Sequence, residues 1–285
     1  MESRPPSESE TRRMLERKLK SLLHAGVTHI PRGRNLKVRE SAQAVGDPPP
    51  TVAQSKLQAV VSVALDTAAH VASPDLPGPA ANVDREQLAS SRVAALNALA
   101  RKVAACTRCA ELARTRTQTV FGIGNPLTRL VFMGEAPGAE EDLRGEPFVG
   151  AAGQLLTDII TKGMKIRRED VYILNTIKCR PPGNRTPSPE EAANCREFLD
   201  GQLAILQPEF ICCLGAVASQ NLLGTSLPIG QLRGRFHDFG GVKVMCTYHP
   251  AYVLRNPSSK RQVWEDIQKL MKEMGLLRET SRPTS

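Results

Sequence analysis

The chain has 285 residues, of which 41% are hydrophobic and only 4% aromatic, and its formal net charge is +9. That length allows one or two domains with a sizeable core, whereas no apolar run approaches the roughly 18 residues that would span a bilayer. Because the start of the chain is rich in Pro, Ser and Glu and shows no signal peptide, we expect a cytoplasmic protein without membrane contact. The positive charge fits a nucleic-acid partner, although many enzymes with small anionic substrates share it.

The first 85 residues differ in composition from the rest. They hold nine of the 21 prolines and no aromatic residue, since the first Phe, Trp or Tyr of the chain is Phe121. Such a segment buries too little apolar surface to offset the entropy of ordering it. We therefore expect a largely disordered or weakly helical extension over residues 1–85. Within it, the apolar residues of 11–27 recur on one helical face, which predicts a short amphipathic helix that is either solvated or docks on a partner or on DNA.

From residue 84 onward, short apolar runs alternate with helical patterns. The runs predict four buried strands, at residues 129–134, 171–176, 209–215 and 242–248. Ser188, Pro189 and Glu191 form a capping-box signature that begins one of the intervening helices. The alternation predicts an α/β fold, namely a three-layer α/β/α sandwich with a four-stranded parallel sheet. We assign this domain to residues 86–275 and a tail to 276–285.

Four of the seven cysteines have a spacing that suits metal ligands. They form one C-x2-C pair and two single cysteines in separate predicted elements: Cys106, Cys109, Cys179 and Cys195. Disulfides are not expected in a reducing compartment. Four thiolates can hold zinc or an iron–sulfur cluster, and a single C-x2-C pair favours the cluster only mildly; four unligated buried thiols are the alternative. The other three fall inside predicted strands and are expected to be core residues: Cys212, Cys213 and Cys246.

Unusual residues follow the predicted strands, whose carboxyl ends meet at one edge of a parallel sheet, where ligands bind. Glu135 and Glu141 lie in a Gly- and Pro-rich loop and suit the positioning of a water molecule, with helix capping as the alternative. Phe148 is either a core residue or a stacking surface for a flat ligand. Asn175 ends a strand with an amide whose donor and acceptor match a pyrimidine edge. His249 follows the last strand, and its position facing the other loops favours a functional role.

Beyond this histidine, Leu254 and Arg255 are followed by Lys260 and Arg261. An apolar side chain beside basic ones suits insertion into a duplex together with phosphate contacts. We therefore expect Leu254 and Arg255 to bind DNA, the alternative being a surface leucine among solvated charges.

Several of these motifs occur together in one order. "GEAPGAEED", "GEPFVG", "LNTIKCRPPGNRTPSPEE", "LGA" and "YHPAYVLR" resemble the family 4 uracil-DNA glycosylases, the iron–sulfur branch of their superfamily. The resemblance covers about residues 103–274. It implies a 4Fe–4S cluster on the four spaced cysteines and uracil-containing DNA as the partner. It also implies an enzyme that flips uracil out of DNA and hydrolyses its N-glycosidic bond, leaving an abasic site.

The resemblance further implies the residues that bind uracil: Glu135, Ala136, Pro137, Phe148, Asn175 and His249. Phe148 would stack on the base, Asn175 would read its edge, and His249 would hydrogen-bond its O2. Glu135 and Glu141 match the acidic positions of the motif, and with His249 they are the catalytic candidates, placing water or stabilising a sugar cation. Related families carry an Asp at the position of Ala136, so this chain lacks a directly equivalent general base.

Flipping a base out of a duplex costs a few kcal/mol, which Leu254 in the vacated gap and Arg255 on a phosphate would offset. Two other functions compete with this one. A non-catalytic nucleic-acid-binding module with a metal cluster would not need Asn175 and His249 at strand ends. A redox protein would need a second cofactor site, and the sequence contains no nucleotide-binding fingerprint. We expect the protein to be a monomer.

Overall fold

The computed structural model describes residues 79–277, with side chains from residue 83 onward. The helix predicted over residues 11–27 lies outside the described residues, as do most of the predicted extension and most of the predicted tail. The described part begins with α3 (Pro79–Ala104), so the first helix of the domain starts earlier than residue 84, where its pattern becomes visible in the sequence.

A six-stranded sheet lies at the centre of the described residues, in the order β1-β3-β2-β4-β6-β5. Its four inner strands are parallel and coincide with the four predicted ones: β2 (Leu130–Gly134), β3 (Tyr172–Asn175), β4 (Phe210–Leu214) and β6 (Val242–Thr247). β2, β3 and β4 are buried along their whole length, because helices cover both faces of the sheet.

The prediction of a sheet with only four parallel strands is therefore incomplete. Two antiparallel edge strands, β1 (Ile123–Gly124) and β5 (Phe236–Phe239), make the sheet mixed. β1 is two residues long, too short to show any periodicity. β5 joins β6 through Gly240 and Gly241, which both have positive φ angles, of 59° and 87°. That two-glycine turn is typical of a tight β-hairpin.

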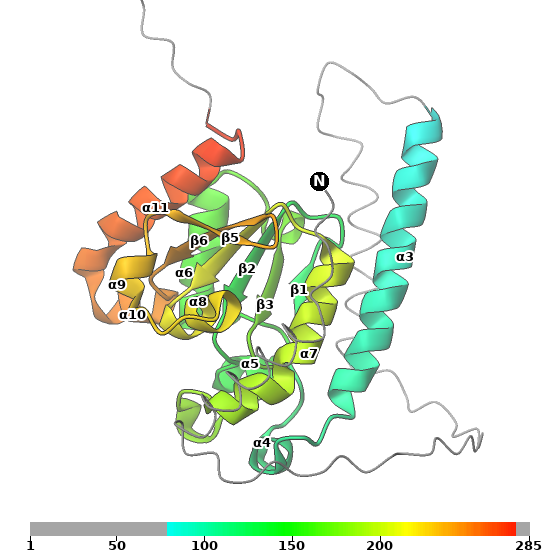
Figure 1. Ribbon diagram of the computed structural model, residues 1–285, viewed down its shortest axis with the longest axis vertical. Helices are drawn as coiled ribbons and strands as arrows, with labels where there is room; N and C mark the ends of the chain where they lie inside the picture. The colour runs from blue at the N-terminus through cyan, green and yellow to red at the C-terminus, as the bar shows by residue number, and fades with distance from the viewer. Residues whose placement is uncertain (1–78, 278–285) are drawn as a thin grey trace, which may run out of the picture. The chain divides into compact units, whose positions relative to one another are not determined.

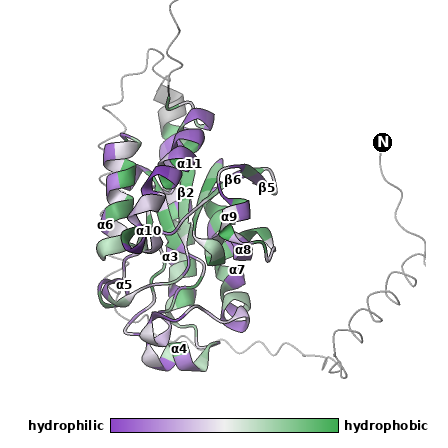
Figure 2. Cartoon of the chain, turned by 90° about the vertical axis from the view of Figure 1, so that its left-hand side faces the viewer, coloured by the Kyte–Doolittle hydropathy of each residue, from purple (hydrophilic) through white to green (hydrophobic). Residues whose placement is uncertain are grey.

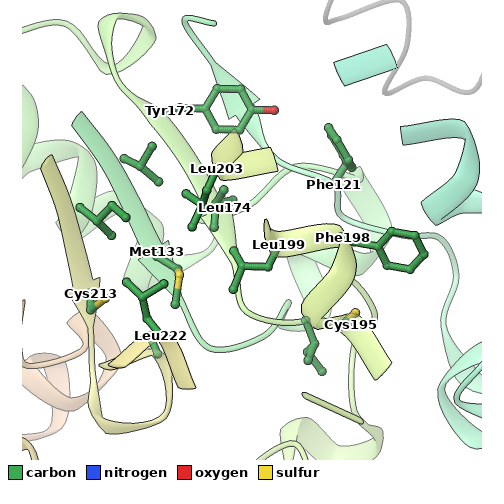
Figure 3. Close-up of a cluster of buried hydrophobic side chains, with 14 of the residues drawn as sticks. Phe121, Met133, Tyr172, Leu174, Cys195, Phe198, Leu199, Leu203, Cys213 and Leu222 are labelled. Atoms are coloured by element: carbon green, nitrogen blue, oxygen red, sulfur yellow. The ribbon is translucent and has the colours of Figure 1, made fainter. Parts of the chain in front are cut away.

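Alternate side chains of the inner strands enter two separate hydrophobic clusters, one on each face of the sheet. On one face, Val131 and Met133 pack with residues of α3, α7 (Pro189–Leu206) and α8 (Ala216–Leu223). Figure 3 shows part of this cluster, including Met133, Leu199 and Leu222. On the other face, Leu130 and Phe132 pack with α6 (Ala151–Asp158) and α11 (Lys260–Glu273). The arrangement of helices on both faces agrees with the predicted layers (Figure 1).

Figure 2 shows the hydrophobic colour gathered along the strands and hydrophilic residues on the outer surfaces of helices such as α11. The remaining short helices are α4 (Ala110–Thr115), α5 (Ala139–Arg144), α9 (Ile229–Leu232) and α10 (Pro250–Arg255). Within residues 79–277, no helix combines the length and the apolar character needed to cross a bilayer.

The predicted capping box at the start of α7 is confirmed. Ser188 Oγ accepts from the backbone N–H of Glu191 at 3.1 Å, and a Glu191 carboxylate oxygen accepts from the backbone N–H of Ser188 at 2.7 Å. α6 continues into one π-helical turn, Ile159–Gly163. The segment between β2 and α6, which includes α5, and the segment between β3 and α7 both leave the carboxyl ends of strands, and they contribute to the candidate site.

Candidate active site and cysteine centre

A cavity of about 420 Å³ opens where β2, β3 and β6 end. Every residue predicted to bind uracil or to act in catalysis lines it: Glu135, Ala136, Pro137, Glu141, Phe148, Asn175 and His249. Of the two predicted DNA-binding residues, Arg255 lines the cavity and Leu254 does not. The strand ends thus bring together residues that lie more than 100 positions apart in the chain.

Phe148 forms one wall of the cavity and is only 6% exposed. Its φ angle is 56°, in the left-handed region that few bulky residues adopt. Two glycines leave room for it: a Cβ at Gly153 would lie 1.9 Å from the Phe148 carbonyl oxygen, and one at Gly134 would lie 2.6 Å from its ring. Arg168 fixes the same residue by donating to the Phe148 carbonyl at 3.0 Å. Phe148 is therefore both a core residue and a wall of the cavity.

Asn175 ends β3 and is 2% exposed. Its backbone carbonyl accepts from Lys178 Nζ at 2.7 Å, but its side-chain Oδ1 has no hydrogen-bond partner within the described residues. A Cβ at Gly134 would lie 2.4 Å from that oxygen, so the glycine lets the amide occupy this position. A buried acceptor without a partner is costly, and at the cavity wall it suits a ligand that donates a hydrogen bond.

His249 is the N-cap of α10, where its Nδ1 accepts from the backbone N–H of Ala251 at 3.1 Å. Since Nδ1 accepts, a neutral ring must carry its hydrogen on Nε2, which has no partner within the described residues. Burial, and after it the charge of Arg255, lower the pKa of His249 to about 4, against a smaller opposing effect of Glu141. The ring is thus a neutral hydrogen-bond donor at physiological pH, and it lies 5.6 Å from the Phe148 ring, centroid to centroid.

The two predicted carboxylates have different surroundings. Glu141 accepts from three backbone N–H groups, those of Gly138 at 3.1 Å, Val149 at 2.9 Å and Gly150 at 3.0 Å. Burial raises the pKa of Glu135, and an interaction with the Thr186 side chain lowers it to a smaller extent. Glu141 therefore ties the loop before α5 to the loop before α6, whereas Glu135 has few fixed partners.

α10 carries the predicted DNA-binding residues along the rim of the cavity. Leu254 is 46% exposed, and Arg255 makes no hydrogen bond or ion pair with any described residue. Tyr252, on the same helix, is 40% exposed and stacks on Tyr248 with ring centroids 5.0 Å apart. An exposed apolar side chain and an unpaired cation thus stand next to the cavity.

The four spaced cysteines come from four segments of the chain. Cys106 follows α3, Cys109 is the N-cap of α4, Cys179 follows β3 and Cys195 lies in α7. All four are free thiols that belong to the same hydrophobic cluster or pack against it. Burial raises the pKa of Cys109, Cys179 and Cys195, and a negative charge on Cys106 would raise each of them further. Within the residues the structure describes, no set of His, Cys, Asp or Glu side chains is arranged to hold a metal ion.

Cations stand next to these thiols. Arg116 donates to Cys179 Sγ at 2.9 Å and to the carbonyl oxygen of Cys106 at 2.9 Å. Lys178 is fully buried, and burial lowers its pKa to about 8 while the thiolates of Cys195 and Cys179 oppose that effect. These positive groups lie where a bound cluster with thiolate ligands would bring negative charge. The remaining cysteines, at 0% exposure in β4 and β6, confirm the prediction of core residues: Cys212, Cys213 and Cys246.

The chain is similar in sequence to known proteins of one family. A sequence profile of the uracil DNA glycosylase superfamily matches residues 121–268. A type-4 uracil-DNA glycosylase of Thermotoga maritima is 51% identical over 172 residues, which are 59% of this chain and 88% of that protein. The chain belongs to the type-4 family of uracil-DNA glycosylases. Another member, from Archaeoglobus fulgidus, is 43% identical over 183 residues, 61% of this chain and 91% of that protein. A type-5 enzyme of Pyrobaculum aerophilum is 30% identical over 145 residues, 45% and 63% of the two chains.

Some site residues of this type-4 family member are not evident from its sequence. Pro181, Asn184, Arg185 and Thr186, which follow Cys179, also line the cavity. Arg116 was likewise missed as a neighbour of the cysteines. The basic residues on either side of Cys179 in "KCR" were a signal for positive charge around the candidate thiolate ligands. That signal concerns Lys178 and gives no indication of Arg116, which is 63 residues away in the sequence.

Proposed function

We propose that this protein removes uracil from DNA in base excision repair, by flipping the base into the cavity and hydrolysing its N-glycosidic bond. The observation that carries this proposal is the unpartnered Oδ1 of Asn175, buried in a wall of the same cavity as Phe148 and His249. Uracil offers an N3–H donor for that oxygen, and its O4 accepts from the amide nitrogen. A flat ring of this kind also suits stacking on Phe148.

The chemistry requires charge stabilisation on both sides of the breaking bond. Negative charge develops on uracil, and His249 donates its Nε2–H to O2 as that charge grows. Positive charge develops on the sugar, where Glu135 supplies an opposing carboxylate and positions the attacking water. Preorganised groups of this kind, held in place before the reaction, are often the largest contribution to catalysis. Glu141, predicted as a second catalytic carboxylate, lines the same cavity, but its three backbone bonds favour a positioning role.

The direct experiment is an excision assay on labelled oligonucleotides. A uracil-containing strand is expected to release free uracil and to become cleavable by alkali at that position. The same strand with thymine in place of uracil, whose 5-methyl group has to fit against the cavity wall, serves as the matched control. Absence of uracil release from both single- and double-stranded substrates would contradict the proposal.

Leu254 and Arg255 are proposed to contact the DNA around the flipped nucleotide. The exposed Leu254 fills the gap that uracil leaves in the stack, and the unpaired Arg255 binds a neighbouring phosphate. Both lie on α10, whose N-cap is His249, so one short helix presents the leaving-group donor and the DNA contacts together.

We also propose that Cys106, Cys109, Cys179 and Cys195 hold a 4Fe–4S cluster. The described side chains are not arranged to hold a single metal ion, so the support is the chemistry of the donor set. It consists of four free thiols in or against one hydrophobic cluster, with a guanidinium and an ammonium group beside them. When bound, the cluster would cross-link α3, α4, α7 and the loop after β3. The visible absorption spectrum together with iron and sulfide content tests the proposal: Cys179→Ala is expected to abolish both signals, and the core control Cys213→Ala to retain them. A colourless protein that contains zinc would contradict it.

The cytoplasmic location and the monomeric state expected from the sequence stay predictions. Sedimentation of the purified full chain at several concentrations tests the second of them.

A further inference from the structure

One wall of the cavity is a solvent-exposed loop. Pro181, Asn184, Arg185 and Thr186 line the cavity, and residues 183–186 are exposed on their other sides. Gly183 and Asn184 adopt φ angles of 63° and 56°, and the backbone N–H of Asn184 donates to the Pro181 carbonyl at 3.0 Å. A turn of this size buries little apolar surface of its own, so contacts with the rest of the domain must hold it in place.

The Arg185 side chain provides such contacts. Its Nη1 and Nη2 donate to the two carboxylate oxygens of Glu191 at 2.8 and 2.7 Å, and Nη2 also donates to Glu111 at 2.7 Å. The Glu191 side chain is only 10% exposed and also forms the capping box of α7. A bidentate arginine–carboxylate pair whose carboxylate is buried and held in place, as that of Glu191 is, is stronger and more specific in geometry than an ordinary surface ion pair.

Both carboxylates belong to helices that carry candidate cluster ligands. Glu111 lies in α4, whose N-cap is Cys109, and Glu191 lies one turn before Cys195 in α7. The chain between Cys179 and Arg185 is short and contains the loop itself. One guanidinium group in the cavity wall therefore contacts both α7, which contains Cys195, and α4, which begins after Cys109.

We propose that Arg185 is a positioning residue that couples the cysteine centre to the uracil pocket, by fastening the 181–186 loop to α4 and α7. The inference rests on the proposed function and the proposed cluster. A cluster that holds α4 and α7 together would set the positions of Glu111 and Glu191. Through its hydrogen bonds to these two carboxylates, Arg185 would then hold the 181–186 loop in position. Thr186, the next residue, interacts with Glu135, so the position of the loop reaches a carboxylate of the cavity.

The first test compares Arg185→Gln with Arg108→Gln in the full-length, cluster-loaded protein. Arg108 is the matched control, because it pairs with Glu197 of α7 at 2.6 Å next to α4 but does not line the cavity. Hydrogen exchange at residues 184–186 is expected to be at least about 10-fold faster in Arg185→Gln, since 10-fold is the scale of a single lost charge-assisted bond and Arg185 makes three. It should be unchanged in Arg108→Gln. The kcat/KM for uracil DNA should fall in Arg185→Gln at equal iron and sulfide content. Arg185→Lys should give intermediate values of both the exchange rate and kcat/KM, since lysine keeps the charge but cannot form a bidentate pair.

A second test uses the reciprocity of coupling between two sites. Free uracil in the pocket is expected to slow the loss of visible cluster absorbance to a chelator in the wild type and in Arg108→Gln, but not in Arg185→Gln. Unchanged loop exchange in Arg185→Gln, equal protection by uracil in that variant, or no protection in the wild type would overturn the proposal. Iron loss in proportion to activity loss would overturn it as well. A cluster-loaded wild type that releases no uracil from DNA would instead refute the proposed function, while the exchange data still test Arg185.

Discussion

The substitution His249→Asn separates two contributions of this side chain. Nδ1 of His249 caps α10 by accepting from the backbone N–H of Ala251 at 3.1 Å, and asparagine is among the preferred N-cap residues. The Nε2–H donor, in contrast, has no equivalent in the shorter asparagine. Removing one preorganised donor from a site of developing negative charge lowers kcat by about 10²–10³-fold, or about 2.7–4 kcal/mol. We therefore expect a loss of that size in kcat with little change in Tm or in DNA affinity.

Single-turnover excision from an end-labelled uracil oligonucleotide measures the effect. His249→Ala loses both the cap and the donor, so it should show the same kinetic loss and in addition a stability decrease of about 1 kcal/mol. Because burial and Arg255 lower the pKa of His249 to about 4, the ring stays neutral from pH 5 to 8, and the wild-type rate should not fall as the pH rises through 6.5. Wild-type kcat in His249→Asn would refute the leaving-group role. A rate that falls above pH 6.5 in the wild type only would show that a protonated ring acts instead.

Three further predictions concern the other residues of the cavity. Asn175→Asp should weaken the preference for uracil over cytosine, measured by competition between the two substrates; an unaltered preference would exclude Asn175 as the reader. Because burial raises the pKa of Glu135, the ionised form is present only above that raised pKa, so the wild-type rate should be lost as the pH falls through it. Glu135→Gln should be slow, and its rate should not decrease further as the pH falls. A decrease that persists in the variant would show that another group titrates. Arg255→Gln should raise KM and leave kcat unchanged. The slope of log KM against log salt concentration should fall by the amount expected for about one lost phosphate contact; an unchanged slope would show that Arg255 does not contact the DNA phosphates.

The parallel part of the sheet was predictable because its strands are short, continuous apolar runs buried on both faces. The edge strands were not predicted, for two different physical reasons. β1, Ile123–Gly124, is held only by its pairing with β3 and has no pattern of its own. β5 is half exposed and mixes Phe with His and Asp, so its apolar signal is weak. The Gly240–Gly241 pair between β5 and β6 was a readable hairpin signal.

The positions of Glu135, Asn175 and His249 followed from one rule, since each stands where a parallel strand ends. The roles of Gly134 and Arg185 could not be obtained in this way. Gly134 is important because the side chains of Phe148 and Asn175 occupy the space that a Cβ at this position would need. Arg185 sits in an exposed loop, and its proposed role depends on two carboxylates: Glu191, six residues away, and Glu111, 74 residues away. The contact with Glu111 leaves no trace in the local sequence. Contacts between segments remote in sequence leave no local pattern, whereas strand ends do.

Two of the carboxylates that follow β2, Glu135 in the loop and Glu141 in α5, have different surroundings and suit different tasks. Glu141 accepts from the N-cap amides of both α5 and α6, at Gly138 and Gly150, so its charge is compensated by two helix starts and it is held in place. The same carboxylate also bonds Val149, the neighbour of Phe148, and so helps to fix the wall on which uracil would stack. Glu135 lacks such compensation, and its raised pKa reflects a carboxylate that gains most when positive charge appears beside it. In the proposed reaction, the oxocarbenium-like sugar carries that charge only as the N-glycosidic bond breaks. We therefore propose that Glu135 acts in the transition state and that Glu141 keeps the loops around the cavity in position.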